Sequence, residues 1–161
     1  MDEKHSRRSQ SVLIYILPAL MDMALSLVLF VGTVRAVKLG GDATRAAFVL
    51  AVWSLIYVVA CPLIGRIVTP GNARSLIMTA CGLFALASGL LAVVTGFAAM
   101  LVLVGICGVA GALFFPPFQL FMKGVDSAGG RSITYSTGLY TFAWSTGFAC
   151  GPFVAGFLMQ L

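Results

Sequence analysis

The chain has 161 residues, of which 60% are hydrophobic and only 9% are charged. A soluble domain carries charge on roughly a quarter of its residues, so this composition excludes a water-covered globular protein and indicates an integral membrane protein. The formal net charge of +5 would suggest nucleic-acid binding in a soluble chain. Here the basic residues lie in the N-terminal segment and in short loops, so orientation in a membrane explains them and no nucleic-acid partner is expected.

Five apolar runs are long enough to cross a hydrocarbon core as helices. After a polar segment at residues 1–11, interpreted as a cytoplasmic tail, we predict spans at about 12–34, 46–64, 75–94, 97–122 and 132–158. The expected fold class is therefore all-α, with a transmembrane bundle over residues 12–161. The basic start resembles a signal peptide, but the first run is too long for a signal h-region and contains Asp22, which favours a retained span.

The polar hinge between the second and third runs predicts the orientation. It holds Arg66 and Arg74 around the Pro70-Gly71 turn, and short arginine-containing loops tend to stay in the cytoplasm during insertion. With the hinge inside, seven basic residues are cytoplasmic (Lys4, Arg7, Arg8, Arg66, Arg74, Lys123, Arg131) and three are outside (Arg35, Lys38, Arg45). We therefore predict a multi-pass protein of the cell or inner membrane with a cytoplasmic N-terminus.

No catalytic or metal-binding pattern stands out in the sequence. It has no Gly-rich phosphate loop, zinc-ligand spacing or Ser/His/Asp set, and its one histidine, His5, lies in the N-terminal segment. The cysteines all fall inside apolar runs, where this residue packs as a small hydrophobe. They are Cys61, Cys81, Cys107 and Cys150. We expect no cofactor and no metal, and a membrane-embedded enzyme is the weakest hypothesis.

Asp22 lies near the middle of the first span and is the only acidic residue within the five spans. A charge at the bilayer centre costs roughly 2.5 to 3.5 kcal/mol on insertion scales, so this side chain should face a cavity or a partner rather than lipid. One interpretation is a proton or cation site, or a contact to a cationic substrate. The other is a protonated or hydrogen-bonded acid that holds helices together.

The fifth span carries a stripe of polar residues. Thr137, Thr141 and Ser145 recur at i, i+4 and i+8 and so share one side of a helix, with Tyr140 and Trp144 on the adjacent side. This polar stripe, with Gln119 near the cytoplasmic end of the fourth span, is a candidate lining for a substrate or ion pathway. Alternatively, these groups bond to the backbone or to neighbouring helices.

Glycines recur in the fourth and fifth spans, where they would let helix backbones approach closely. They are Gly105, Gly108, Gly111, Gly147 and Gly151. Pro152 directly follows Gly151, and because proline removes a helix hydrogen bond it predicts a bend in the fifth span.

The hinge resembles the loop between the second and third helices of the major facilitator superfamily of transporters, whose pattern reads Gly-x-x-x-Asp-Arg-x-Gly-Arg-Arg/Lys. Gly65 and Arg74 match its ends, and Arg66 is a common choice at its second place. The chain departs from the pattern at four places: Thr69 stands where the family has Asp, Pro70 where it has the first Arg, Asn72 where it has Gly and Ala73 where it has Arg. The resemblance implies that Gly65, Arg66 and Arg74 belong to a gating loop that helps to latch the outward-facing state.

A second resemblance lies in the fifth span. Gly147-x-x-x-Gly151-Pro152-x-x-x-Gly156 is similar to the Gly-x-x-x-Gly-Pro-x-x-Gly-Gly element of the family's fifth helix, with Ala155 in place of the first terminal glycine. The resemblance implies bending and close packing there, at an interface with the other half of a transporter. Many proton-coupled members of the family carry an arginine in the fourth helix, whereas the fourth span here has no charge before Lys123. The Pro-rich signature that drug-proton antiporters show near the end of their first helix is also missing, so the resemblance disfavours a drug-proton antiporter.

The resemblance covers the first five of the family's usual twelve helices, part of its N-terminal six-helix bundle. It implies secondary active transport of a small solute, with a substrate site at the interface of two six-helix halves that rock between inward-open and outward-open states. Asp22 adds the expectation of coupling to a proton or a cation. We therefore expect the chain to act as the N-terminal part of a larger transporter, completed by missing C-terminal helices or by a partner membrane protein. The alternative is a small non-transporting membrane subunit or scaffold that packs against partner helices.

Overall fold

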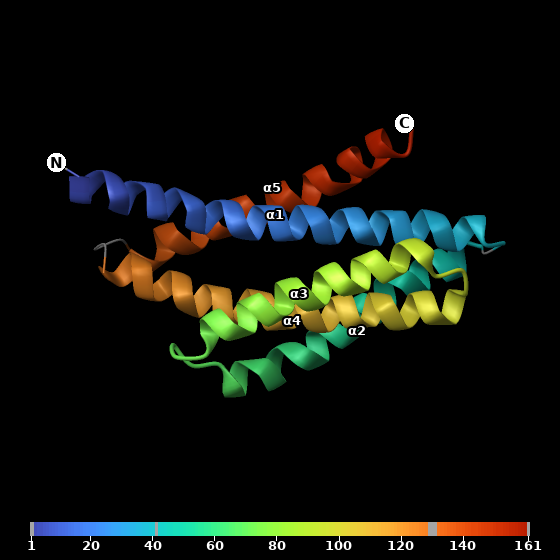
Figure 1. Ribbon diagram of the computed structural model, residues 1–161, viewed down its shortest axis with the longest axis horizontal. Helices are drawn as coiled ribbons and strands as arrows, with labels where there is room; N and C mark the ends of the chain where they lie inside the picture. The colour runs from blue at the N-terminus through green and yellow to red at the C-terminus, as the bar shows by residue number, and fades with distance from the viewer. Residues whose placement is uncertain (1, 41, 129–131, 161) are drawn as a thin grey trace. The chain divides into compact units, whose positions relative to one another are not determined.

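The computed structural model describes residues 2–40, 42–128 and 132–160 of the chain. Over these ranges five helices follow one another (Figure 1): α1 (Asp2–Lys38), α2 (Ala43–Ile67), α3 (Ala73–Val93), α4 (Phe97–Ala128) and α5 (Ile133–Leu158). The all-α fold class predicted from the apolar runs is confirmed. Gly129, Gly130 and Arg131, part of the expected loop between the fourth and fifth spans, lie outside the described residues.

Four stretches of helix are long and apolar enough to cross a membrane. They are Ile14–Lys38, Ala43–Ile67, Ala73–Val93 and Phe97–Gly124. The architecture is therefore that of a helical integral membrane protein. α5 has 26 residues, which is long enough, but it is not among the four because serine, threonine, tyrosine and glycine are interspersed along it.

The helices extend beyond the predicted spans at several ends. α1 begins at Asp2 and so includes residues interpreted as a cytoplasmic tail, and α4 continues past Met122 to Ala128. Hydropathy indicates which part of a helix can lie within the hydrocarbon core. The helix itself continues for as long as its backbone hydrogen bonds form. α5 continues through Pro152, which membrane helices tolerate when neighbours satisfy the freed carbonyl.

Side chains cap the starts of α2 and α5. Asp42 accepts a hydrogen bond from the Arg45 amide over 3.1 Å, and Ser132 accepts one from the Tyr135 amide over 3.2 Å. Each bond satisfies one of the amides that a helix start leaves without an intrahelical partner. The Arg45 amide bond also lowers the pKa of Asp42 below its ordinary value of 3.8.

The chain divides into two compact units. Unit 1 consists of Met1–Leu27 and Met122–Leu161, and it holds the first part of α1, the last turns of α4 and all of α5. Unit 2 is Val28–Phe121, and it holds the end of α1, all of α2 and α3, and most of α4.

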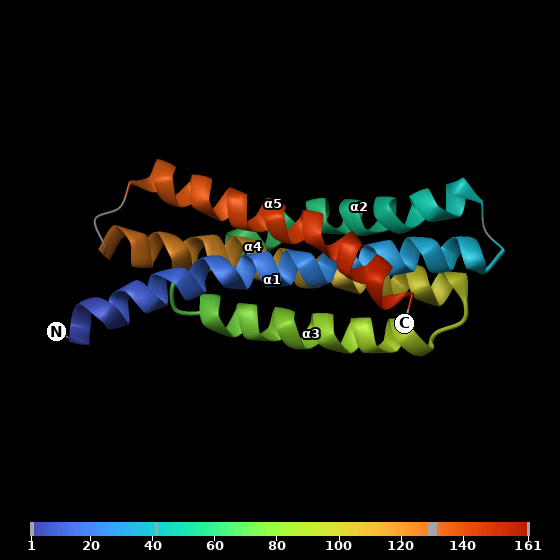
Figure 2. The ribbon, with the colours of Figure 1, turned by 90° about the horizontal axis from the view of Figure 1, so that it is seen from above.

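In unit 1, α5 crosses α1 at two glycines (Figures 1 and 2). A Cβ atom added at Gly147 would lie 2.8 Å from the carbonyl carbon of Ala19, and one added at Gly151 would lie 2.6 Å from the Met23 carbonyl oxygen. Only glycine permits backbones to approach this closely. Because later residues of α5 meet later residues of α1, the two helices run in the same direction.

In unit 2, the same device joins α4 to α2. A Cβ atom at Gly105 would lie 2.6 Å from the Ile56 side chain, and one at Gly108 would lie 2.9 Å from the Trp53 carbonyl oxygen. Gly111 lies against the Tyr57 ring. The close approach predicted for these three glycines is therefore present, and α2 is the helix that they contact.

An aromatic cluster fills the second part of α4 in unit 2. The Phe114 ring stacks on Phe118 with centroids 5.4 Å apart and meets Phe115 edge-on at 5.2 Å, while Phe115 meets Tyr57 of α2 edge-on at 6.2 Å. The three phenylalanines are buried. Offset and edge-on ring pairs of this kind add to the stabilisation from buried area alone.

Candidate functional site

Asp22 is buried inside the first candidate span. Its side chain is 1% exposed, and its Oδ2 atom has no hydrogen-bond partner among the described residues. Burying a carboxylate without a partner is costly, so this oxygen calls for a proton, a cation or an added polar group.

Two serines are the other buried polar residues of the described chain, and both belong to unit 1. Ser26 lies one turn after Asp22 on α1 and donates its hydroxyl to the Met23 carbonyl over 3.2 Å. Ser136 on α5 is buried, and its hydroxyl oxygen has no partner among the described residues. Neither serine was predicted as a site residue from the sequence. The i, i+4 spacing from Asp22 was a signal that could have identified Ser26.

The polar stripe predicted on α5 lies on the exposed side of that helix. Thr137, Thr141 and Ser145 are exposed, and Trp144 is 41% exposed and stacks on Phe148. The buried side consists of Ser136, Tyr140, Gly147, Gly151 and Ala155. The structure therefore does not bring the stripe into one enclosed site with Asp22. Periodicity shows which residues share a side, but here the small residues decide which side packs, because they permit contact with α1.

The remaining predicted pathway and gating residues lie on the surface of unit 2. Gln119 is exposed, as are Gly65, Arg66 and Arg74. A Cβ atom at Gly65 would meet nothing within 4 Å. No close packing therefore requires glycine at this position in the described chain.

The hinge is held by Asn72, a residue that was not predicted to belong to the gating loop. The Asn72 side chain accepts a hydrogen bond from the Thr69 amide over 2.7 Å and donates one to the Ile67 carbonyl over 2.8 Å. One amide side chain therefore joins the end of α2 to the start of α3. This is a turn held by local side-chain-to-backbone bonds.

The Gly-Pro element of α5 is divided by its packing. Gly147 and Gly151 are buried against α1, and Pro152 is half-buried. A Cβ atom at Gly156 would meet nothing within 4 Å. The first part of the element therefore forms a helix contact within unit 1, and its last glycine faces open space.

Two arginines that were predicted to lie on the outer side of the membrane make structural contacts in unit 2. The Arg35 guanidinium donates to the carbonyls of Leu91 and Val94 at the end of α3. The guanidinium carbon of Arg45 lies 5.2 Å from the centre of the Phe97 ring at the start of α4. A cation at a helix C-terminus is favourable because the last carbonyls are unpaired and carry the negative end of the helix dipole. These contacts give a structural reason for both arginines, whichever side of a membrane they face.

Within the described residues, no three His, Cys, Asp or Glu side chains lie close enough together to hold a metal ion. The candidate site is thus Asp22 with Ser26 one turn after it on α1, inside a unit built on the α1–α5 contact. No family model, no curated protein and no solved structure matches this chain.

Proposed function

We propose that this chain forms part of a membrane transporter that moves a small solute in step with a proton or a cation. Asp22 carries the proposal: its carboxyl group is buried inside a membrane span, with one oxygen unpaired among the described residues. Acids at such positions are costly and rare, and those that occur mark proton and ion pathways by default. The likeness of the hinge and of the Gly-Pro element to the major facilitator superfamily points the same way and rests on those motifs alone.

In this proposal Asp22 couples ion binding to a change of conformation. With a proton or cation bound, the carboxyl group is neutral and its burial costs little. Without the ion, the charge favours a conformation in which water reaches the side chain. An ion that binds one conformation more tightly than another shifts the population between them, which is the thermodynamic basis of alternating access.

The exposed polar stripe on α5 fits the same proposal. Hydroxyl groups on the lipid-facing side of a membrane helix find no hydrogen-bond partner in the lipid, whereas the same groups can line a pathway between helices. We place further helices, from the same protein or from a partner, over Thr137, Thr141 and Ser145. The α1–α5 contact supports a membrane crossing by α5, and the excess of basic residues in the cytoplasmic segments supports a cytoplasmic N-terminus.

The test is ion flux into liposomes that contain the native protein, with a pH-sensitive dye inside and a potassium diffusion potential as the driving force. Asp22→Asn keeps the size of the side chain and removes its charge, and it should abolish the flux. Asp42→Asn is the matched control, because it changes an exposed acid and retains a good helix cap. Equal flux from Asp22→Asn and the unaltered protein would remove Asp22 from the mechanism.

A second candidate function is a small non-transporting membrane subunit or scaffold. The tight glycine contacts of both units favour it, since they suit a rigid bundle. Asp22 is only 1% exposed, so in this case it is a neutral acid that holds helices within the chain. A stoichiometric partner that copurifies in detergent, together with no flux from the unaltered protein, would support this candidate over the transporter.

A further inference from the structure

An apolar groove of about 410 Å³ lies between α1 and α5 within unit 1. Four residues of α1 between Tyr15 and Leu20 form one wall, and four residues of α5 between Leu139 and Thr146 form the other. The groove lies just before the crossing at Gly147, where the two helices diverge toward their N-terminal ends.

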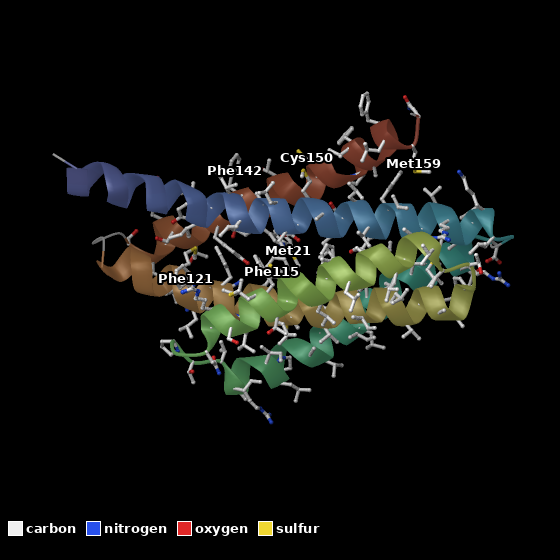
Figure 3. The ribbon with its side chains drawn as sticks, viewed as in Figure 1. Met21, Phe115, Phe121, Phe142, Cys150 and Met159 are labelled. Carbon is white, nitrogen blue, oxygen red and sulfur yellow. The ribbon has the colours of Figure 1, made fainter. Side chains whose placement is uncertain are left out.

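The walls of the groove offer few polar groups to a ligand. The Thr146 hydroxyl donates to the Phe142 carbonyl over 2.8 Å, so its hydrogen is already used. Leu20 and Phe142 are 51% and 70% exposed at the edges, and Phe142 projects from α5 in Figure 3. The α1 wall belongs to a candidate membrane span, so the medium outside the groove is lipid acyl chain. An acyl chain fills such a gap because empty apolar space forfeits dispersion contacts.

The end of the groove that lies toward the N-termini of α1 and α5 favours a negatively charged group. Ser132 caps α5 there, and the amides of the first turn carry the positive end of the helix dipole. The first turns of α1 contain Lys4, Arg7 and Arg8, while the acidic Asp2 and Glu3 lie farther from the groove along the chain. At a rise of 1.5 Å per residue, the three basic residues precede Tyr15 along the helix by about 10 to 16 Å. This distance is enough to place them in the headgroup region when Tyr15 lies among the acyl chains.

We infer that this groove binds one acyl chain of an anionic membrane phospholipid, with the phosphate at the end where α1 and α5 begin. The apolar walls hold the chain, and the basic start of α1 with the N-terminus of α5 selects the negative headgroup. The lipid acts as a wedge between two helices whose contact positions Asp22 and Ser26. This inference goes beyond the proposed function and holds for a transporter or a scaffold alike.

The test is native mass spectrometry of the full protein after equilibration with an equimolar mixture of phosphatidylglycerol and phosphatidylcholine. We expect one phosphatidylglycerol to be retained, with roughly a fivefold preference over phosphatidylcholine, the size of one basic residue acting at a membrane surface. Ala143→Phe fills the groove and should abolish retention. Ala149→Phe is the matched control, because Ala149 is an exposed residue of α5 that does not line the groove.

A second comparison tests the headgroup. Replacing Lys4, Arg7 and Arg8 together by glutamine should make retention of the two lipids equal, whereas Lys123→Gln should leave the preference intact. Leu20→Trp narrows the groove from α1 and replaces Ala143→Phe if that variant does not fold. Equal retention of both lipids by the unaltered protein, or equal retention by the Ala143→Phe and Ala149→Phe variants, would overturn the inference. So would the absence of any retained lipid, which would mean that a protein helix covers the groove.

Discussion

Unit 1 and unit 2 are built from similar apolar helices, yet they bury different chemistry. All three buried polar residues of the described chain, Asp22, Ser26 and Ser136, belong to unit 1. In unit 2 the buried residues are apolar, with the α4 phenylalanines among the largest, and the polar atoms without a partner among the described residues, Trp53 Nε1 and Ser88 Oγ, belong to half-buried residues. Both units use glycine for their closest helix contacts, at α1–α5 in one and at α2–α4 in the other.

The two units differ in the polar groups that they bury rather than in how their helices pack. Lipid is as apolar as a leucine side chain, so membrane helices associate through close contact and hydrogen bonds rather than through exclusion of water. Unit 2 follows this rule, with aromatic rings and glycines at its helix contacts. Unit 1 departs from it by burying an acid, which stability alone does not explain.

Phe118→Ala should destabilise unit 2 most. The Phe118 side chain is 1% exposed and stacks on Phe114, so truncation leaves a cavity and should cost about 3 to 5 kcal/mol. Phe153→Ala removes the same atoms from a residue that is 80% exposed and should change the free energy of unfolding little. Reversible unfolding in mixed micelles measures both. Similar losses for the two variants would show that the aromatic cluster does not form the core.

Gly151→Ala should destabilise unit 1 by about 1 to 3 kcal/mol, because the added methyl group overlaps the backbone of α1 at Met23. Gly156→Ala is the matched control on the same helix, since its methyl group meets open space and should be nearly neutral. In a Trp53→Phe background, Trp144 is the single tryptophan and reports on unit 1. A neutral Gly151→Ala variant would show that α1 and α5 do not pack at this glycine.

Arg35→Ala should destabilise unit 2 by about 1 to 2 kcal/mol, because the last carbonyls of α3 lose a cation that satisfies them. Arg35→Lys should recover only part of the loss, since one ammonium group cannot reproduce the planar fork that reaches both Leu91 and Val94. The melting temperature in detergent measures the series. If lysine restored it fully, charge alone would account for the effect.

Asp42 gives the smallest prediction, a pH dependence at the start of α2. The Arg45 amide lowers the pKa of Asp42, so its stabilising contribution is complete above the ordinary value of 3.8 and is lost as the pH falls through the lower folded value. The stability difference between the unaltered protein and Asp42→Ala should therefore shrink in acid. Asp42→Asn keeps a cap without a titratable group and should show no such change. A difference that is constant with pH would contradict this account of the cap.

Much of the fold followed from local sequence properties. An apolar run of about 20 residues matches the thickness of the hydrocarbon core, so the five helices were predictable from the sequence alone. Burial of Asp22 was anticipated for the same local reason, because a charge within such a run is costly in lipid. The hinge was also visible, although the bonds of Asn72 that hold it depend on the backbone geometry of the turn.

Which side of each helix is buried was decided only by tertiary packing. On α5 the sequence shows a polar stripe at Thr137 and a small-residue side at Gly147, and either could have been buried. The structure buries the second because a glycine lets the α1 backbone approach, whereas bulk hydrophobicity does not distinguish a neighbouring helix from lipid. By itself, the sequence determined the class of protein and the course of its helices. Which groups meet depended on contacts between residues far apart in the chain, such as Arg35 with Val94, and hydropathy carries no record of such pairs.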